Sequence, residues 1–184
     1  MSLLHTIANA ARGSRPRVQR LVDTRVAWPP DTVVTPHDIS VGGRSLTRLA
    51  RERGTPSVLI VPGTNASTAA HHVTLIVTRV VGRVEGSRNR RVQLTVDCAL
   101  DQIVRTCAHA RLLTSPQADA RTAVKVVSSQ DSVNGLQTRL PVDSSPGDLL
   151  LLMCHGVVAM NQARKAPSSP VTDDDDAGGW RCMK

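Results

Sequence analysis

The sequence predicts an α+β fold that is rich in strands: a compact, mostly antiparallel β-domain with two or three short helices, a basic N-terminal arm and a flexible C-terminal tail. Most apolar segments are short runs of Val, Ile and Leu bounded by turn residues, which is typical of strands. Only a few segments have the apolar spacing of a helix. The 184 residues include no Phe and no Tyr, so Val, Leu, Ile and Ala must pack the core.

Composition divides the chain into three parts. Residues 1–36 are expected to form a basic arm with short helices and a Pro-rich linker, because the segment AWPPDTVVTPHD holds three prolines in twelve residues. Residues 37–160 contain the apolar and alternating segments and are expected to form the core domain. Residues 161–184 are polar and contain the run Asp173–Asp176, which predicts a flexible acidic tail.

Two segments within the core domain are predicted to be helical. The clearer one runs from a Ser45 cap to a Gly54 stop. The other covers residues 97–113, where an apolar stripe from Leu100 to Cys107 has spacings of three and four residues. Asp97 is expected to cap its first turn.

The remaining apolar segments are predicted to be strands. A hairpin is expected around the loop EGSRN, and its first arm is apolar on both faces near Leu75–Val77, which favours a central position in a sheet. The segment HGVVAM (155–160) is expected to be the return arm of a tight hairpin. The predicted strands cover residues 57–63, 71–84, 90–96, 122–128, 136–142 and 148–154, and the first of them is expected to be a short buried strand.

The most apolar segment ends in the pair Cys154–His155, which raises the question of a catalytic cysteine. A nucleophilic cysteine needs a base within hydrogen-bonding reach. Adjacent residues on a strand point to opposite faces, so this pair is predicted to be structural, with Cys154 in the core. The apolar run Leu149–Cys154 is six residues long, far below the roughly 18–20 that a spanning helix needs, so no membrane span is expected.

The segment PGDLLLLMCHG (146–156) resembles the histidine-bearing strand of caspase-like cysteine peptidases, which ends in Ser-Gly-His-Gly. The resemblance implies that His155 is a catalytic base. Cys154 stands where the family has glycine, and only Cys182 follows as a nucleophile. A degenerate caspase-like peptidase is therefore kept as one alternative.

No cofactor or metal is expected. Cys98, Cys107 and His109 contain ligand types for zinc, but two residues two positions apart on a helix diverge around its axis. The sequence contains no P-loop and no G-x-G-x-x-G motif. The four cysteines form no C-x-x-C motif, which favours a reducing intracellular compartment or a virion.

The charge pattern leads to the main functional hypothesis. The formal net charge is +8, and arginine outnumbers lysine by 20 to 3. A basic arm of this kind is typical of proteins that bind polyanions, and without Phe or Tyr the contacts should be made to phosphates rather than to stacked bases. The expected nucleic-acid-binding residues are Arg12, Arg15, Arg17, Arg20 and Arg25.

The sequence thus predicts a non-enzymatic structural or assembly protein that self-associates and binds nucleic acid, with the layout of a small viral coat protein or nucleoprotein. A second alternative is a small accessory protein–protein interaction module. The aromatic-poor, arginine-rich composition is also compatible with an overlapping reading frame, which favours this alternative slightly.

Overall fold

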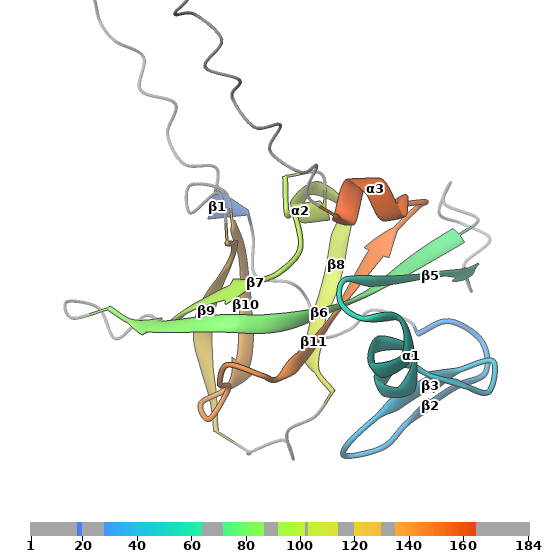
Figure 1. Cartoon of the computed structure of the whole chain (residues 1–184), viewed down its shortest axis with the longest axis horizontal. Coiled ribbons are helices and arrows are strands. Elements are labelled where there is room, and N and C mark those ends of the chain that lie inside the picture. Colours follow the sequence, from blue (N-terminus) through green and yellow to red (C-terminus); the bar gives the residue numbers. More distant parts are fainter. Residues whose placement is uncertain are drawn as a thin grey trace, which may run out of the picture.

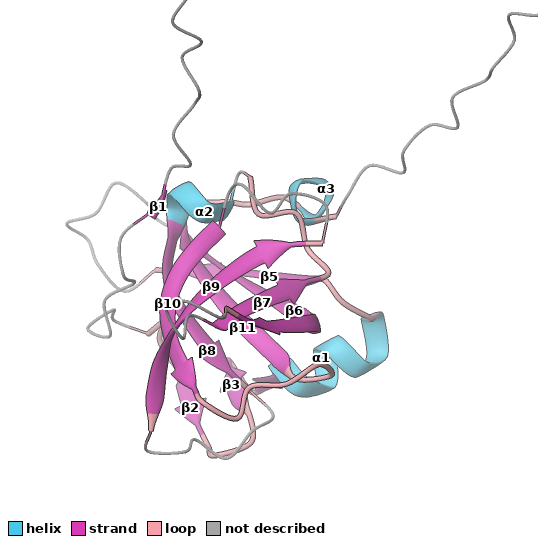
Figure 2. Ribbon diagram, turned by 90° about the vertical axis from the view of Figure 1, so that its left-hand side faces the viewer, coloured by secondary structure: helices cyan, strands magenta, loops and turns pink. Residues whose placement is uncertain are grey.

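The computed structural model describes residues 18–19, 28–63, 72–86, 92–101, 103–113, 120–129 and 135–164 (Figures 1 and 2). The predicted arm residues Arg12, Arg15, Arg17, Arg20 and Arg25, and the predicted acidic tail from residue 165 onward, lie outside this part of the chain. No helix within the described residues is long and apolar enough to cross a membrane.

The described chain is strand-rich with a few short helices, which confirms that part of the predicted fold class. Its larger sheet has eight strands, and most neighbours are antiparallel, while β1–β10 and β7–β9 are parallel. Along the sheet the order is β1 (Val18–Gln19), β10 (Gly135–Pro141), β9 (Arg121–Ser128), β7 (Val92–Val96), β6 (His72–Glu85), β11 (Leu149–His155) and β8 (Cys107–Leu112), and β5 (Ser57–Pro62) pairs with β6.

A smaller sheet lies at one side of the larger one, next to the helix α1 (Leu46–Arg53) (Figure 1). Its strands are β2 (Thr32–Val34), β3 (Ile39–Val41) and β4 (Arg44–Ser45). Gly42 and Gly43 both have positive φ, 55° and 74°, and make the two-residue turn between β3 and β4. The segment predicted as a linker thus contributes the strand β2 to this sheet.

The larger sheet curls until β8 and β10 contact each other, so its strands enclose a core of their own (Figure 2). Ile76 and Val80 of β6 point into this first core, together with Leu94 of β7. Leu75 and Val77 of β6 point the other way, into a second core under the small sheet and α1. The central position predicted for this strand is confirmed, since β6 pairs with β5, β11 and β7.

The helix α1 has the boundaries that its sequence predicts. The Ser45 side chain accepts a hydrogen bond from the Arg48 amide at 3.0 Å, and Gly54 ends the helix with a φ of 76°. Leu46 and Ala50 are buried against the second core, whereas Leu49 is only partly buried.

The helix predicted over residues 97–113 is mostly wrong. The helix α2 covers only Ile103–Thr106, and residues 107–112 form the strand β8 along the edge of β11. The predicted apolar stripe is buried except for its last residue, Cys107, which is partly buried, but β8 alternates buried Ala110 and Leu112 with half-buried neighbours. An open edge on β11 offers this segment hydrogen bonds along a whole strand, which outweighs its weak helical preference.

Two further expectations are corrected. The segment predicted as a return arm after His155 turns at Gly156 and leads into the short helix α3 (Met160–Ala163) instead. The strand β5, expected to be buried, is only partly so, and Ile60 is 43% exposed because β5 lies at the edge of the sheet.

Asp97 does not cap a helix as predicted. Its carboxylate accepts hydrogen bonds from the Thr78 hydroxyl at 2.6 Å, from the Arg79 amide at 3.0 Å and from the Thr55 hydroxyl. One carboxylate therefore ties the end of β7 to β6 and to the loop that leads from α1 into β5.

We expect Asp97→Ala to lower the free energy of unfolding by about 1–3 kcal/mol, because the substitution leaves three donors without their acceptor. Asp101→Ala is the matched control: this carboxylate is exposed and its loss should change stability by less than about 0.5 kcal/mol. Urea denaturation of both variants measures the difference. Equal stabilities would show that the Asp97 network contributes nothing.

Candidate functional site

The structure separates the residues of the candidate cysteine site. Cys154 is fully buried in the first core, whereas His155 is exposed on the opposite face of β11. The prediction that Cys154 is a core residue is confirmed. These two side chains do not form a nucleophile–base pair, and Cys182 lies outside the described residues.

The residues considered for zinc also have structural roles. The His109 ring packs edge-on against Trp28, with ring centroids 5.3 Å apart. Burial raises the pKa of the Cys98 thiol to about 12. Within the described ranges no group of three His, Cys, Asp or Glu side chains is arranged to hold a metal ion.

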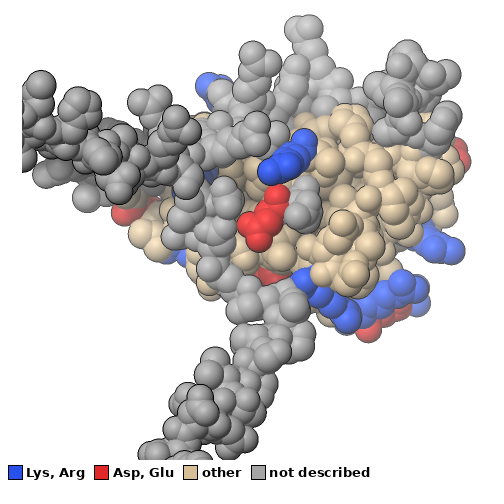
Figure 3. All heavy atoms as spheres, turned by 90° about the horizontal axis from the view of Figure 1, so that it is seen from above, with Lys and Arg blue, Asp and Glu red and all other residues tan. Residues whose placement is uncertain are grey.

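The most concentrated positive charge in the described chain lies on β4 and α1. Arg44, Arg48, Arg51 and Arg53 are all exposed, and Glu52 is the one acidic residue among them. Glu52 pairs with Arg48 at 2.6 Å, which raises the pKa of that guanidinium. On the face shown in Figure 3, basic side chains gather at one edge of the body beside an acidic one, while most of the described surface is uncharged.

A shallow depression of about 400 Å³ lies along the exposed side of α1. Arg44, Arg48 and Arg53 line it from the turn before the helix to its last turn. Guanidinium groups carry several donors in a planar fork, which suits phosphate and carboxylate oxygens. This depression can therefore hold an anionic group.

The start of α1 is held in place by Asp38, which precedes β3. The Asp38 carboxylate accepts a hydrogen bond from the Thr47 amide at 3.0 Å. Burial alone would raise the pKa of Asp38, but hydrogen bonds from Ser45 and Thr47 outweigh burial and lower it. The acidic group thus stays ionised and fixes the first turn of the basic helix.

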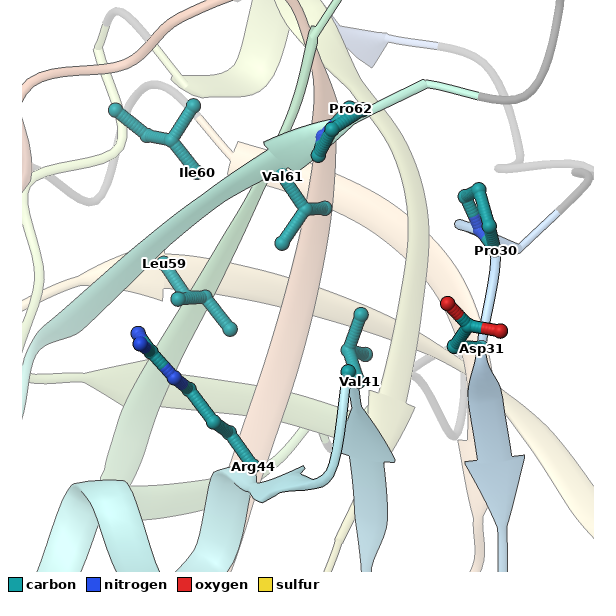
Figure 4. A pocket seen from close by; sticks show the side chains of 9 residues that line it. Pro30, Asp31, Val41, Arg44, Leu59, Ile60, Val61 and Pro62 are labelled. Carbon is teal, nitrogen blue, oxygen red and sulfur yellow. The ribbon is translucent and has the colours of Figure 1, made fainter.

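Next to the basic helix lies an apolar pocket of about 340 Å³ between β5 and the ends of β2 and β3 (Figure 4). Val41 and Val61 face each other across it, and Leu59 extends toward Arg44. Arg44 lines both the pocket and the depression along α1. The full lining consists of Pro30, Asp31, Val41, Gly42, Arg44, Leu59, Ile60, Val61 and Pro62.

The strand β5 leaves one edge open beside this pocket. Among the described residues it pairs with β6 alone, and its sequence SVLIVP contains no charged side chain. Proteins usually protect such an edge with charges, proline, a bulge or a covering element, and of these β5 itself carries only Pro62, its last residue. An open, uncharged edge is a typical place for another strand to add.

No sequence pattern indicated this site, because the residues that line it are far apart along the chain. One signal could have revealed the small sheet: Gly42-Gly43 between the alternating segments ISV and RS is a typical two-residue hairpin turn. The exposure of β5 had no comparable signal, because an edge strand and a buried strand can share the same apolar sequence.

Comparisons with known proteins add little to this geometry. No protein-family model matches the sequence, and no curated protein is similar to it. Among solved structures, the arginine decarboxylase of Paramecium bursaria Chlorella virus is similar with a TM-score of 0.37 and 13% identity, covering 52% of this chain and 29% of the other.

Two diaminopimelate decarboxylases are similar at the same level. The one from M. jannaschii has a TM-score of 0.40 and 12% identity, covering 52% of this chain and 22% of the other. The one from Helicobacter pylori has a TM-score of 0.34 and 17% identity, covering 46% and 21%. The chain thus aligns with less than a third of each enzyme, and similarity this low assigns no function.

We expect Cys154→Ala to lower the free energy of unfolding by about 1–2 kcal/mol, because it opens a small cavity in the first core. His155→Ala should change stability by less than about 0.5 kcal/mol, since the ring is exposed. Neither substitution should alter any binding activity of the folded protein. Thermal and urea denaturation measure the first two effects, and loss of a biochemical activity in folded His155→Ala would favour the caspase-like alternative.

Proposed function

We propose that this chain is a non-enzymatic structural or assembly protein that binds the phosphates of nucleic acids through arginine side chains and associates with further copies of itself. The observation that carries the proposal is the exposed arginine group on β4 and α1. Arg44, Arg51 and Arg53 form no ion pair with another described residue, so their donors are available to an external anion.

The composition limits how nucleic acid would be recognised. The chain has no Phe or Tyr, and Trp28 is packed against His109, so the described part of the chain offers no free aromatic platform for stacking bases; the second tryptophan, Trp180, lies outside it. Arginine contacts to phosphate carry no sequence information by themselves. Binding should therefore be similar for different sequences and should weaken steeply as salt is added.

We expect two arginine-to-glutamine variants to weaken binding to labelled RNA and DNA, one changing the arm and one changing the helix group. Each phosphate contact contributes roughly −0.7 (single strand) to −0.9 (duplex) to the slope of log affinity against log salt, so losing four helix contacts should reduce it by about 3–4. Affinities at three salt concentrations measure the slope. The variants change Arg12, Arg15, Arg17, Arg20 and Arg25, or Arg44, Arg48, Arg51 and Arg53.

A third variant controls for net charge. It also removes four exposed arginines, but these lie on other elements, so it should retain most of the slope if the helix group is the binding site. Wild-type slopes in both the arm and the helix variant would contradict the proposal. If the control variant loses as much of the salt slope as the helix variant, only net charge matters. The control changes Arg79, Arg105, Arg139 and Arg164.

Self-association is proposed at the open edge of β5. The same edge on a second copy can pair with it in antiparallel orientation about a two-fold axis, which gives an interface made of one surface used twice. With the axis at Ile60, this side chain lies opposite its counterpart, and Leu59 lies opposite Val61. Apolar side chains then meet apolar side chains from Val58 to Pro62.

We expect Ile60→Lys to abolish self-association, because it places two positive charges opposite each other across the axis. Val84→Lys is the matched control, since Val84 is also an exposed strand residue, at 59%, but lies on β6 away from this edge. Size-exclusion chromatography with light scattering over a concentration series measures the mass. A wild-type protein that stays monomeric throughout would contradict this part of the proposal.

The accessory interaction module is the second candidate function. It is favoured by the pocket beside β5, where an extended peptide could place apolar side chains next to Val41 and an acidic group at Arg44. Absence of both nucleic-acid binding and self-association would make it the better hypothesis. The degenerate peptidase has less support, because the structure shows no cysteine beside His155: Cys154 lies on the opposite face of β11, and Cys182 lies outside the described part of the chain.

A further inference from the structure

Three thiols that are far apart in the sequence lie together in the first core. Cys98 follows β7, Cys107 begins β8, and Cys154 is next to the last residue of β11. All three are free cysteines. We infer that Cys107 and Cys154 form a redox-active pair, which peroxide oxidises to a disulfide between β8 and β11.

The strand register carries this inference. Cys154 lies directly opposite Cys107 in the antiparallel pairing of β11 with β8. Directly opposite residues have Cα atoms about 4.5–5.5 Å apart, which lies within the roughly 4.4–6.8 Å that disulfides span. The register shifts between Met153 and Cys154, so the pair lies next to an irregularity at the end of the β11–β8 ladder.

The two thiols have different roles within the pair. The Cys107 thiol is hydrogen-bonded to the Cys154 sulfur, which lowers the pKa of Cys154, and the Thr106 hydroxyl lowers it further against the effect of burial. The same hydrogen bond and burial raise the pKa of Cys107. In the structure the Cys107 thiol also donates a hydrogen bond to the His109 carbonyl oxygen at 3.4 Å.

The chemistry balances with hydrogen peroxide as the oxidant. Cys154 is buried, so the reaction requires a local opening at the end of β11 that admits peroxide to the sulfur. The Cys154 thiolate then attacks one peroxide oxygen, so that an S–O bond forms and the O–O bond breaks, giving a sulfenic acid and hydroxide. The Cys107 sulfur then attacks the Cys154 sulfur, an S–S bond forms, and the oxygen leaves with a proton as water. The hydroxide takes up the second thiol proton, so two thiols are oxidised and one peroxide becomes two waters.

Cys98 is the thiol that should not react. Its pKa is raised to about 12 by burial, so it is protonated at neutral pH, and the protonated thiol is a poor nucleophile. It also lies on the segment after β7, whereas the other two face each other across one strand pair. The selectivity of the reaction for Cys107 and Cys154 therefore tests the geometry rather than the general reactivity of buried thiols.

The experiment treats the reduced full-length chain with hydrogen peroxide, blocks remaining thiols under denaturing conditions, and maps the peptides by mass spectrometry. We expect an intramolecular cross-link between Cys107 and Cys154 and a mass loss of about 2 Da. Two of the four cysteines should remain as thiols. Cys107→Ser and Cys154→Ser should each abolish this cross-link, whereas Cys98→Ser, also a change at a buried core position, should retain it.

Other products would overturn the inference. A cross-link from either cysteine to Cys98 or Cys182, a product that links two chains, or four intact thiols at a peroxide dose that oxidises glutathione would each contradict it. The wild-type peptide map decides the question even if a serine variant fails to fold. Far-UV circular dichroism before and after oxidation must agree, because a cross-link formed only in unfolded protein also counts against the pair.

Discussion

The structure depends on one strand, β6, whose middle residues are buried on both faces and are apolar except for two hydrogen-bonded threonines, Thr74 and Thr78. Its 14 residues pair with β5 and β11 over the first half and with β7 over the second. Ile76 and Val80 enter the first core, while Leu75 and Val77 enter the second. A polar residue at any of these positions would be buried whichever way it pointed, so the strand that joins the two cores has the least freedom to change.

The neighbouring strand β11 obeys the same constraint and explains the run LLLLMC. Leu150, Leu152 and Cys154 face the first core, and Leu151 and Met153 face the second. Without Phe or Tyr, each core is filled by many small side chains instead of a few rings. Cysteine is a small, buried hydrophobe in such a core. The cluster of thiols is therefore a consequence of packing. Its redox reactivity would depend on the strand register that places Cys107 opposite Cys154.

Local signals predicted local structure well. The Ser45 cap and the Gly54 stop defined α1, and alternation defined the hairpin of β6 and β7, because hydrogen bonds and apolar faces close together in sequence decide both. Residues 107–112 were predicted as helix because their apolar spacing also fits a helix, and only the distant β11 edge makes them a strand. The candidate site was missed for the same reason: its pocket joins Val41 to Val61 across two sheets.

The exposed arginines and the unpaired edge of β5 lie at the surface of the fold, where they destabilise it least. The arginines of β4 and α1 are exposed beyond the second core, and β5 pairs with β6 alone among the described strands. Two carboxylates hold this region in position, Asp38 at the start of α1 and Asp97 through Thr55 before β5. Repulsion among the arginines is screened by solvent, whereas the acceptors that orient their helix are partly buried. The exposed arginines can therefore be replaced without displacing α1 or β5, because the core sets the positions of both elements.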